Sequence, residues 1–415
     1  MKKIFRISML LFAATLTMTS FTACSDDDDN NDELTANELS IQALSKQYVE
    51  NVVFATYTNL ANNAKTLADE LVAARDNFKK GTLTDTELRK IGDTFLSTRA
   101  YWEASEAFLY GPATTFGIDP HIDTWPLDAD ALATGLNNAS LLEKLEDEES
   151  GASDLAPTLL GFHAIEFIIF RDGNLRTVND LKQEESDEAF TAINAHITGE
   201  QELTYAAAVA NDLMQKCFQL QVAWMGDAAG KDRVEAVEEE WELETQVVDD
   251  YYGDNMLNAG KAGSSFRAWQ DVLVTILNAG CSNICNEVAN TKIGNAWTGE
   301  DVNYIESPYS KKSFADFYDN IMSIKNTLYG GVNLTTPNAN SILAFAEKTN
   351  AALATELKAR LETALSALTT CKNGKAFVDI INGNEKPQYV QAAIDAINAL
   401  DDKLQEAADW AAKVE

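Results

Sequence analysis

Apolar residues recur every three or four positions over long parts of this chain, which is the spacing of one face of an α-helix. Segments of alternating apolar and polar residues, which would indicate half-buried strands, form no series between them. The pattern therefore predicts an all-α protein. The three clearest apolar stripes are Ile41, Leu44, Tyr48, Val52 and Ala55, then Leu353, Leu357, Leu361, Leu365 and Leu368, and finally Val390, Ile394, Ile397, Leu400 and Leu404.

Proline, which ends or kinks helices, is scarce. The chain has seven prolines, and none lies between Thr158 and Ser307. This long stretch without proline predicts long helices. Thr84 and Glu87 match a capping box, which predicts that a helix begins just before Leu88.

The chain is long enough for two domains. About 390 residues follow the first 23, and common domains have about 100 to 150. We place the division near residue 200, after the polar segment Asn194 to Gln201. The prediction is a first helical bundle over residues 38–200 and a second over residues 201–415. Within the first, residues 111–128 hold three prolines and two glycines and are predicted to form a loop.

The N-terminus predicts export and lipid anchoring. Residues 1–23 combine Lys2, Lys3 and Arg6 with a mostly apolar stretch that ends in small residues before Cys24. This resembles a lipoprotein signal peptide, so Cys24 is the predicted lipidation site, and an ordinary signal peptide is the alternative. The strongly acidic residues that follow predict a disordered tether over 24–37. We expect a protein anchored to the outer membrane, at its periplasmic or cell-surface face.

The charge of the chain narrows its partners. The formal net charge is −33, and removal of the basic signal peptide makes it more negative. So acidic a chain is a poor partner for nucleic acid, whereas its electrostatic field attracts cations.

Four cysteines remain after Cys24: Cys217, Cys281, Cys285 and Cys371. In an exported chain they could form disulfides, but sequence cannot choose among the pairings. Cys281 and Cys285 are four residues apart, which is a helical spacing and not the redox CxxC motif. The interpretation is either buried small residues or one structural bridge. Zinc binding by these cysteines is not favoured, because no histidine accompanies them.

The most informative stretch is 159–170, where His163 and Glu166 lie in an otherwise apolar run. Three residues are nearly one helical turn, so both side chains project from one face of a buried helix. Buried polar groups need partners, so the pair is either hydrogen-bonded within the core or holds a ligand. The residues alone leave these two alternatives open. The HExxH and HxxEH zinc signatures need a second histidine, which this stretch lacks.

A second candidate lies at the end of the helix near residue 106. Arg99 and Glu103 are four residues apart, which suggests an ordinary surface salt bridge. Glu106 is followed by Ala107, Phe108 and Leu109, which suggests a carboxylate that points inward.

Two further segments hold candidate ligands. His121, Asp123 and Asp128 lie in the predicted loop, and imidazole with carboxylate suits zinc, iron or manganese. Turn formation by the aspartates and packing of Trp125 are the common alternatives. The later segment 306–316 contains Ser313 and Asp316 at capping-box spacing, so helix initiation explains part of it.

Together these segments resemble the imelysin family of exported bacterial proteins, first catalogued as metallopeptidases. The resemblance implies two related, four-helix-bundle-like domains with a site at their interface, in an exported or lipid-anchored protein linked to iron uptake. The matching segments run in the family's order: Trp102 to Gly111, Asp123 to Asp128, the GxHxxE motif from Gly161 to Glu166, and Glu306 to Asp316.

Two functions follow as hypotheses. The preferred one is a lipid-anchored protein that captures a divalent metal such as iron or zinc, an iron complex or a small ligand, with outer-membrane uptake proteins as possible partners. The alternative is a metallopeptidase that uses the HxxE motif. A purely structural His–Glu pair is the third possibility. The candidate metal ligands are His163, Glu166 and His121, and the candidate ligand-binding residues are Glu106, Trp125, Asp128, Ser310 and Ser313.

Overall fold

The computed structural model describes residues 34–147 and 151–414. The chain divides into the units Met1–Leu34 and Thr35–Glu415, and the second unit is the subject below. The predicted signal peptide, the predicted lipidation site Cys24 and most of the predicted tether lie outside the described residues. Helix α1 (Ala36–Tyr48) begins directly after Thr35, which caps it through a capping box with Glu38.

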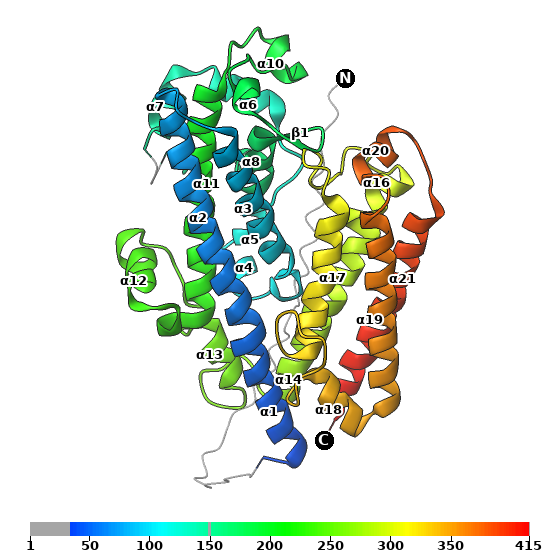
Figure 1. Cartoon of the computed structure of the whole chain (residues 1–415). Helices are drawn as coiled ribbons and strands as arrows, with labels where there is room; N and C mark the ends of the chain where they lie inside the picture. Colours follow the sequence, from blue (N-terminus) through cyan, green and yellow to red (C-terminus); the bar gives the residue numbers. More distant parts are fainter. Residues whose placement is uncertain (1–33, 148–150, 415) are drawn as a thin grey trace, which may run out of the picture. The chain divides into compact units, whose positions relative to one another are not determined.

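Four helices form a first group in the second unit. They are α2 (Phe54–Lys79), α3 (Asp85–Glu103), α8 (Gly161–Ile169) and α11 (Gly199–Met225). α2 packs along both α3 and α11, and α8 fills the space between α3 and α11 (Figure 1). Since α8 is buried along its whole length, the first group encloses the GxHxxE segment.

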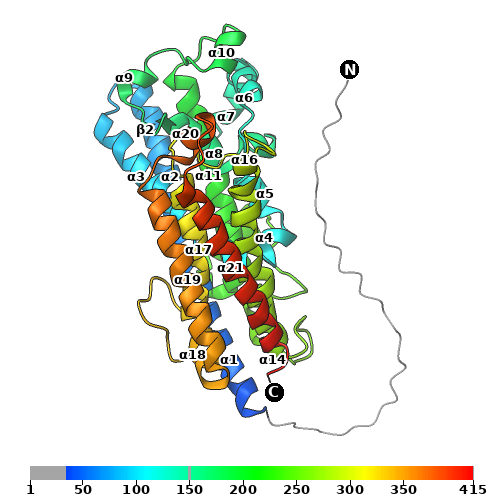
Figure 2. The same ribbon diagram turned by 90° about the vertical axis from the view of Figure 1, so that its right-hand side faces the viewer.

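A second group contains α17 (Ser313–Tyr329), α19 (Ala351–Lys372), α21 (Gln388–Ala411) and the long helical stretch Trp269–Thr298. Figure 2 shows α19 and α21 side by side, as their contacts confirm. The stretch Trp269–Thr298 is long and apolar enough to cross a membrane, but most of it is buried inside the protein, as in the core helix of a globular domain. It comprises α14 (Trp269–Val274), η6 (Thr275–Ser282), α15 (Asn283–Asn286), η7 (Glu287–Lys292) and α16 (Gly294–Thr298).

Shorter elements connect these helices, and the strands among them are one antiparallel pair of two residues each. They are η1 (Val49–Val53), η2 (Glu106–Phe108), α4 (Pro112–Thr115), α5 (Ile118–Ile122), α6 (Ala129–Leu136), α7 (Ala139–Leu145), η3 (Pro157–Leu159), β1 (Phe170–Arg171), β2 (Asn174–Leu175), α9 (Val178–Leu181), α10 (Glu188–Ala192), η4 (Gly226–Ala229), α12 (Lys231–Val234), η5 (Glu235–Glu240), α13 (Tyr252–Leu257), α18 (Ile342–Thr349) and α20 (Phe377–Asn382).

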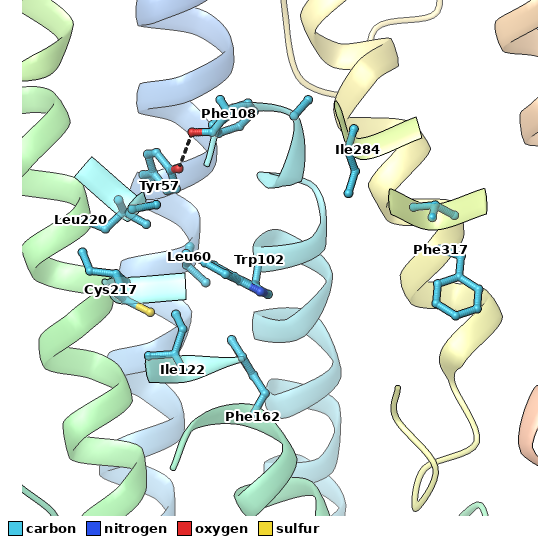
Figure 3. Packing of buried hydrophobic residues seen from close by; sticks show 14 of the residues in the cluster. Tyr57, Leu60, Trp102, Phe108, Ile122, Phe162, Cys217, Leu220, Ile284 and Phe317 are labelled. Carbon is cyan, nitrogen blue, oxygen red and sulfur yellow. Dashed lines mark hydrogen bonds between the residues drawn. The ribbon is translucent and has the colours of Figure 1, made fainter. Parts of the chain in front are cut away.

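The two groups share one hydrophobic core. In Figure 3, Trp102 and Phe162 lie close together in the first group, while Ile284 and Phe317 come from the second. The hydroxyl of Tyr57 donates a 3.2 Å hydrogen bond to the carbonyl of Phe108. The all-α prediction is confirmed.

Several local predictions can be compared with the structure. The capping box is present: Thr84 Oγ1 accepts from the backbone N–H of Glu87, and Glu87 accepts from the backbone of Thr84. The predicted loop 111–128 contains two short helices, α4 and α5. The division near residue 200 stays a prediction, and the structure packs α11, which follows it, against α2 and α8, which precede it.

The four cysteines Cys217, Cys281, Cys285 and Cys371 are all free and buried. Of the two alternatives, buried small residues are therefore confirmed. Burial raises the pKa of the Cys281 and Cys371 thiols to about 12, so both are protonated and unreactive at neutral pH.

Candidate metal centre

The glycine of the GxHxxE motif lets α8 approach α5 closely. Gly161 has φ +71°, and a Cβ built on it would lie 1.9 Å from the carbonyl oxygen of Ile122. Both the backbone conformation and the lack of space require glycine here. The contact brings the start of α8 beside Asp123, the residue after Ile122, and so places His163 within reach of that carboxylate.

Replacing Gly161 with alanine is expected to lower the free energy of unfolding by about 2 to 4 kcal/mol, since strain and overpacking add. Gly81→Ala is a matched control, because Gly81 has nearly the same φ (+72°) and no atom within 4 Å of the added Cβ. It should cost only about 1 to 2 kcal/mol. Urea denaturation measures both, and equal losses would contradict the close-approach argument.

One nitrogen of His163 is held by a carboxylate. His163 Nε2 lies 3.0 Å from Asp123 Oδ1, and Trp102 Nε1 donates a 2.7 Å hydrogen bond to Asp123 Oδ2. Because a carboxylate accepts, Nε2 is the nitrogen that donates to Asp123. Holding one imidazole nitrogen with a carboxylate is how proteins orient the other nitrogen toward a metal.

The other nitrogen faces Glu166. His163 Nδ1 lies 3.7 Å from Glu166 Oε2, and neither atom has a hydrogen-bond partner among the described residues. Glu166 Oε1 accepts a 2.7 Å hydrogen bond from the backbone N–H of Ser310, whose hydroxyl also lacks a partner. All three side chains are at most 2% exposed. Buried polar atoms without hydrogen bonds are rare, so Nδ1, Oε2 and the Ser310 hydroxyl are the candidate ligand atoms of this site.

The protonation of His163 follows from these carboxylates. Burial opposes a charge on the ring, but the nearby carboxylates of Asp123 and Glu166 outweigh it and raise the pKa of His163 to about 8. Without a bound cation, the imidazole is therefore mostly protonated at neutral pH.

Two buried cations join the helix groups next to this pair. The guanidinium of Arg99 (α3) contacts the carboxylates of Glu103, Asp123 and Glu306. The ammonium of Lys292 (η7) lies 3.0 Å from Glu106, 3.3 Å from Glu306 and 3.8 Å from Glu103. Arg99 and Glu103 are 2% and 0% exposed, so their predicted salt bridge exists but its surface position was wrong.

The buried carboxylates outnumber the buried cations. Arg99, Lys292 and His163 face Glu103, Glu106, Asp123, Glu166, Glu306 and Asp316, all largely buried. Burial raises the pKa of Glu306 to about 7, although Lys292 and Arg99 oppose it, and also raises the pKa of Glu106 and Asp316. The surplus negative charge can be neutralised by protons or by a metal ion.

Two positions for a metal ion can be compared. Ligand atoms of Asp123, His163 and Glu306 lie within 4.8 Å of one another, but Arg99 already binds both of these carboxylates and would repel a cation there. At the second position, His163 Nδ1 and Glu166 Oε2 face each other without a hydrogen bond. Two ligands of one ion would be about 2.8 to 3.6 Å apart, from metal bonds of about 2.0 to 2.2 Å at octahedral or tetrahedral angles. A small movement closes their 3.7 Å separation, so this is the better position.

The loop between the groups completes the site. Residues 306–312 begin with Glu306 and present the Ser310 N–H to Glu166. Ser307 and Lys311 adopt positive φ values of 49° and 60°, a strained conformation for side chains of this kind. Lys311 fastens the loop by bonding Asp379 and Asp172.

Trp125 lies beside the pair. Its ring centroid is 5.6 Å from that of His163 and 5.2 Å from that of Tyr304, and Lys292 Nζ lies 5.3 Å from the Trp125 ring. The indole N–H is buried and has no partner among the described residues. A cavity of about 230 Å³ borders Trp125 and His163.

Most of the site residues predicted from the sequence lie in or beside this buried cluster, but Asp128 and His121 do not. His163, Glu166, Glu106, Trp125 and Ser310 are described above, and the Ser313 hydroxyl donates to the carbonyl of Glu306. No side chain caps α17, so Ser313 does not form the expected capping box. The exposed Asp128 instead caps α6 by accepting from the Ala131 N–H. His121 bonds Asp212 of α11 and is only half-buried, so it lies outside the buried cluster.

Sequence reasoning missed Lys292 and Glu306 as members of the site. Glu306 was considered only as the first residue of the segment 306–316, and Lys292 lies in a mostly apolar helix. The usable signal was a single lysine in an apolar run without proline, because such a charge must find buried partners. The π-helical turn η7, which ends at Lys292, has no comparable signature in the sequence.

The sequence profile described as Imelysin, a peptidase family, matches residues 53–404. Iron-regulated protein A of Synechococcus elongatus is 24% identical over 321 residues, which cover 77% of this chain and 73% of that protein.

Two solved structures are also similar. The structure of an iron-regulated protein A precursor from Parabacteroides distasonis has a TM-score of 0.71 at 22% identity and covers 91% of this chain and 96% of its own. An imelysin-like protein from Psychrobacter arcticum has a TM-score of 0.58 at 12% identity and covers 92% of this chain and 98% of its own. At these identities the likeness shows a shared fold.

Proposed function

The chain belongs to the Imelysin family, and from this premise we propose that it captures a metal ion or a metal complex, with iron the first candidate, through His163 and Glu166. The observation behind the proposal is the pair of buried atoms His163 Nδ1 and Glu166 Oε2, which face each other at 3.7 Å and make no hydrogen bond among the described residues. The surplus of buried carboxylates around them favours a cation. A relative named iron-regulated protein A supports an iron-related role.

The residues fit a metal in a specific way. Asp123 would hold Nε2 of the ring, so that Nδ1 and Glu166 Oε2 bind the ion, and the Ser310 hydroxyl lies beside Glu166. Imidazole with carboxylate suits iron and zinc. The metal would replace a proton on His163 and neutralise part of the surplus charge.

A peptidase would need more than this pair. It requires a third protein ligand, an open water position and a general base. The sequence offered His121 and Asp128 as candidates. His121 pairs with Asp212, and Asp128 caps α6, so neither contacts His163. The arrangement supports binding better than hydrolysis. Lipid anchoring at Cys24 in the outer membrane, next to uptake proteins, remains part of the proposal.

Glu166→Gln tests the proposal, because the amide keeps an oxygen for the Ser310 N–H but loses the charge. We expect the affinity for Fe(II) or Zn(II), measured by isothermal titration with metal analysis, to fall about 10- to 100-fold. The matched control is Glu184→Gln. Glu184 also pairs with a histidine, His196, at 2.9 Å, but on the surface, so its loss should change nothing. Absence of metal binding in the unmodified protein, or equal affinity in both variants, would refute the proposal.

A further inference from the structure

The cavity beside His163 shows what else the site must accommodate. One imidazole nitrogen and one carboxylate fill only part of the coordination sphere of iron or zinc. The remaining positions need donors from another molecule. His163, which is 2% exposed and whose Nδ1 makes no hydrogen bond, is itself part of the cavity wall, so the cavity is placed to hold such a molecule.

The walls of the cavity are mostly apolar and partly aromatic. Trp125, Leu127, Ile305, Tyr309 and Val378 line it, with Pro126, Val302 and Pro308 also present. Its volume of about 230 Å³ is below the range of about 300 to 1,000 Å³ that is usual for small-molecule sites. A ligand the size of a single aromatic ring fits this volume, whereas a large chelator with several chelating groups does not.

The charges around the cavity restrict the ligand further. None of its lining residues is a lysine or an arginine. The carboxylates behind His163 outnumber the cations there. A chelator with several free carboxylates would therefore bring negative charge into a cavity whose lining has no lysine or arginine to pair with it, which is costly. A chelator of low charge avoids this cost, because its donor oxygens are neutralised by the metal.

Trp125 offers the cavity one unused donor. Its indole N–H is buried without a partner, and its ring lies 5.6 Å from that of His163. A metal-bound oxygen next to His163 would be an acceptor for this N–H.

We propose that the cavity binds the organic part of a metal complex, and that this part is a small planar aromatic chelator with two adjacent oxygen donors. The inference rests on the proposed function, since the metal links the chelator to His163 and Glu166. The ring packs among Trp125, Tyr309 and Val378, and one donor oxygen accepts from the Trp125 N–H.

Two ferric complexes distinguish this chelator class from carboxylate chelators. A 1:1 complex of Fe(III) with catechol and a complex of Fe(III) with citrate are each titrated into the full chain. Binding of both complexes is measured by equilibrium dialysis with iron analysis. Binding of the catechol complex is also followed by the visible charge-transfer band of the catecholate. We expect the catechol complex to bind at least about tenfold more tightly, equivalent to one good hydrogen bond or more. Equal or tighter binding of citrate would overturn the inference.

Variants locate the chelator in the cavity. Val378→Trp fills it and should weaken binding of the catechol complex at least about tenfold, while Zn(II) alone still binds. Trp125→Phe removes the indole N–H together with part of the aromatic surface and should lower the affinity for the catechol complex by at least about tenfold. Trp410→Phe is the control, because Trp410 packs on Phe345. The inference would be overturned if both cavity variants bound the catechol complex as tightly as the unmodified protein does.

The outcomes separate the two proposals. Binding of Zn(II) with no advantage for the catechol complex removes the cavity inference and leaves the proposed function intact. Failure of both Zn(II) and the catechol complex to bind the unmodified protein removes the proposed function, and the cavity inference with it. Binding of the catechol complex that depends on Glu166 supports both.

Discussion

Replacing Arg99 with methionine is expected to lower the free energy of unfolding of the metal-free protein by about 3 to 5 kcal/mol. The guanidinium contacts Asp123, Glu103 and Glu306, and all four side chains are at most 4% exposed. Methionine is unbranched like arginine and can pack its apolar side chain in the same space. It carries no charge, however, so three buried carboxylates lose their partner. Urea denaturation in the presence of a chelator measures the loss.

The control and the pH dependence sharpen this prediction. Arg89 lies on the same helix α3 but is exposed, so Arg89→Met should cost less than about 0.5 kcal/mol. The loss in Arg99→Met should be smaller at pH 5 than at pH 8. Glu306, with a pKa of about 7, is protonated at the lower pH and then no longer needs the cation. A loss below about 1 kcal/mol at pH 8 would show that Arg99 does not hold the cluster together.

Metal affinity is expected to fall about 50-fold between pH 8 and pH 6. The pKa of His163 is about 8, so below that pH a metal must displace a proton from Nδ1. Competition with one proton lowers the apparent affinity about tenfold per pH unit. Above pH 8 the ring is neutral and this dependence ends. Protons on Glu306, if also displaced, would act in the same direction.

Titration calorimetry in buffers of different ionisation enthalpy measures the released protons directly. About one proton per metal should be released from His163 at pH 6.5, and fewer above pH 8. His196→Gln is the control, because the side chain of His196 is 77% exposed and pairs with Glu184 on the surface. An affinity that is constant from pH 6 to pH 8 would mean that Nδ1 is not a ligand.

Much of the fold could be predicted because it depends on local patterns. The apolar stripe from Val390 to Leu404 lies within α21, and the capping box of Thr84 starts α3, since both signals act within a few residues. His163 and Glu166 could be singled out for the same reason, since three residues of one helix suffice to place them together. The fold of such helices is largely a consequence of periodicity.

The rest of the site depends on long-range contacts that no local pattern shows. Lys292 reaches Glu106 across 186 positions of sequence, and Arg99 reaches Glu306 across 207. Asp128 illustrates the opposite error, since an aspartate before a helix serves equally well as a ligand or as a cap, and the structure uses it as a cap. Only the packing of the two helix groups decides between such roles.

The four buried, free cysteines have a consequence for how the protein matures. Because Cys217, Cys281, Cys285 and Cys371 form no cross-links, the described part of the chain needs no oxidase or disulfide isomerase to reach its native state. Its melting temperature should not respond to a mild reductant. The described part of the chain is therefore expected to fold equally well in a reducing cytoplasm and in an oxidising cell envelope. Its recombinant production then does not require export.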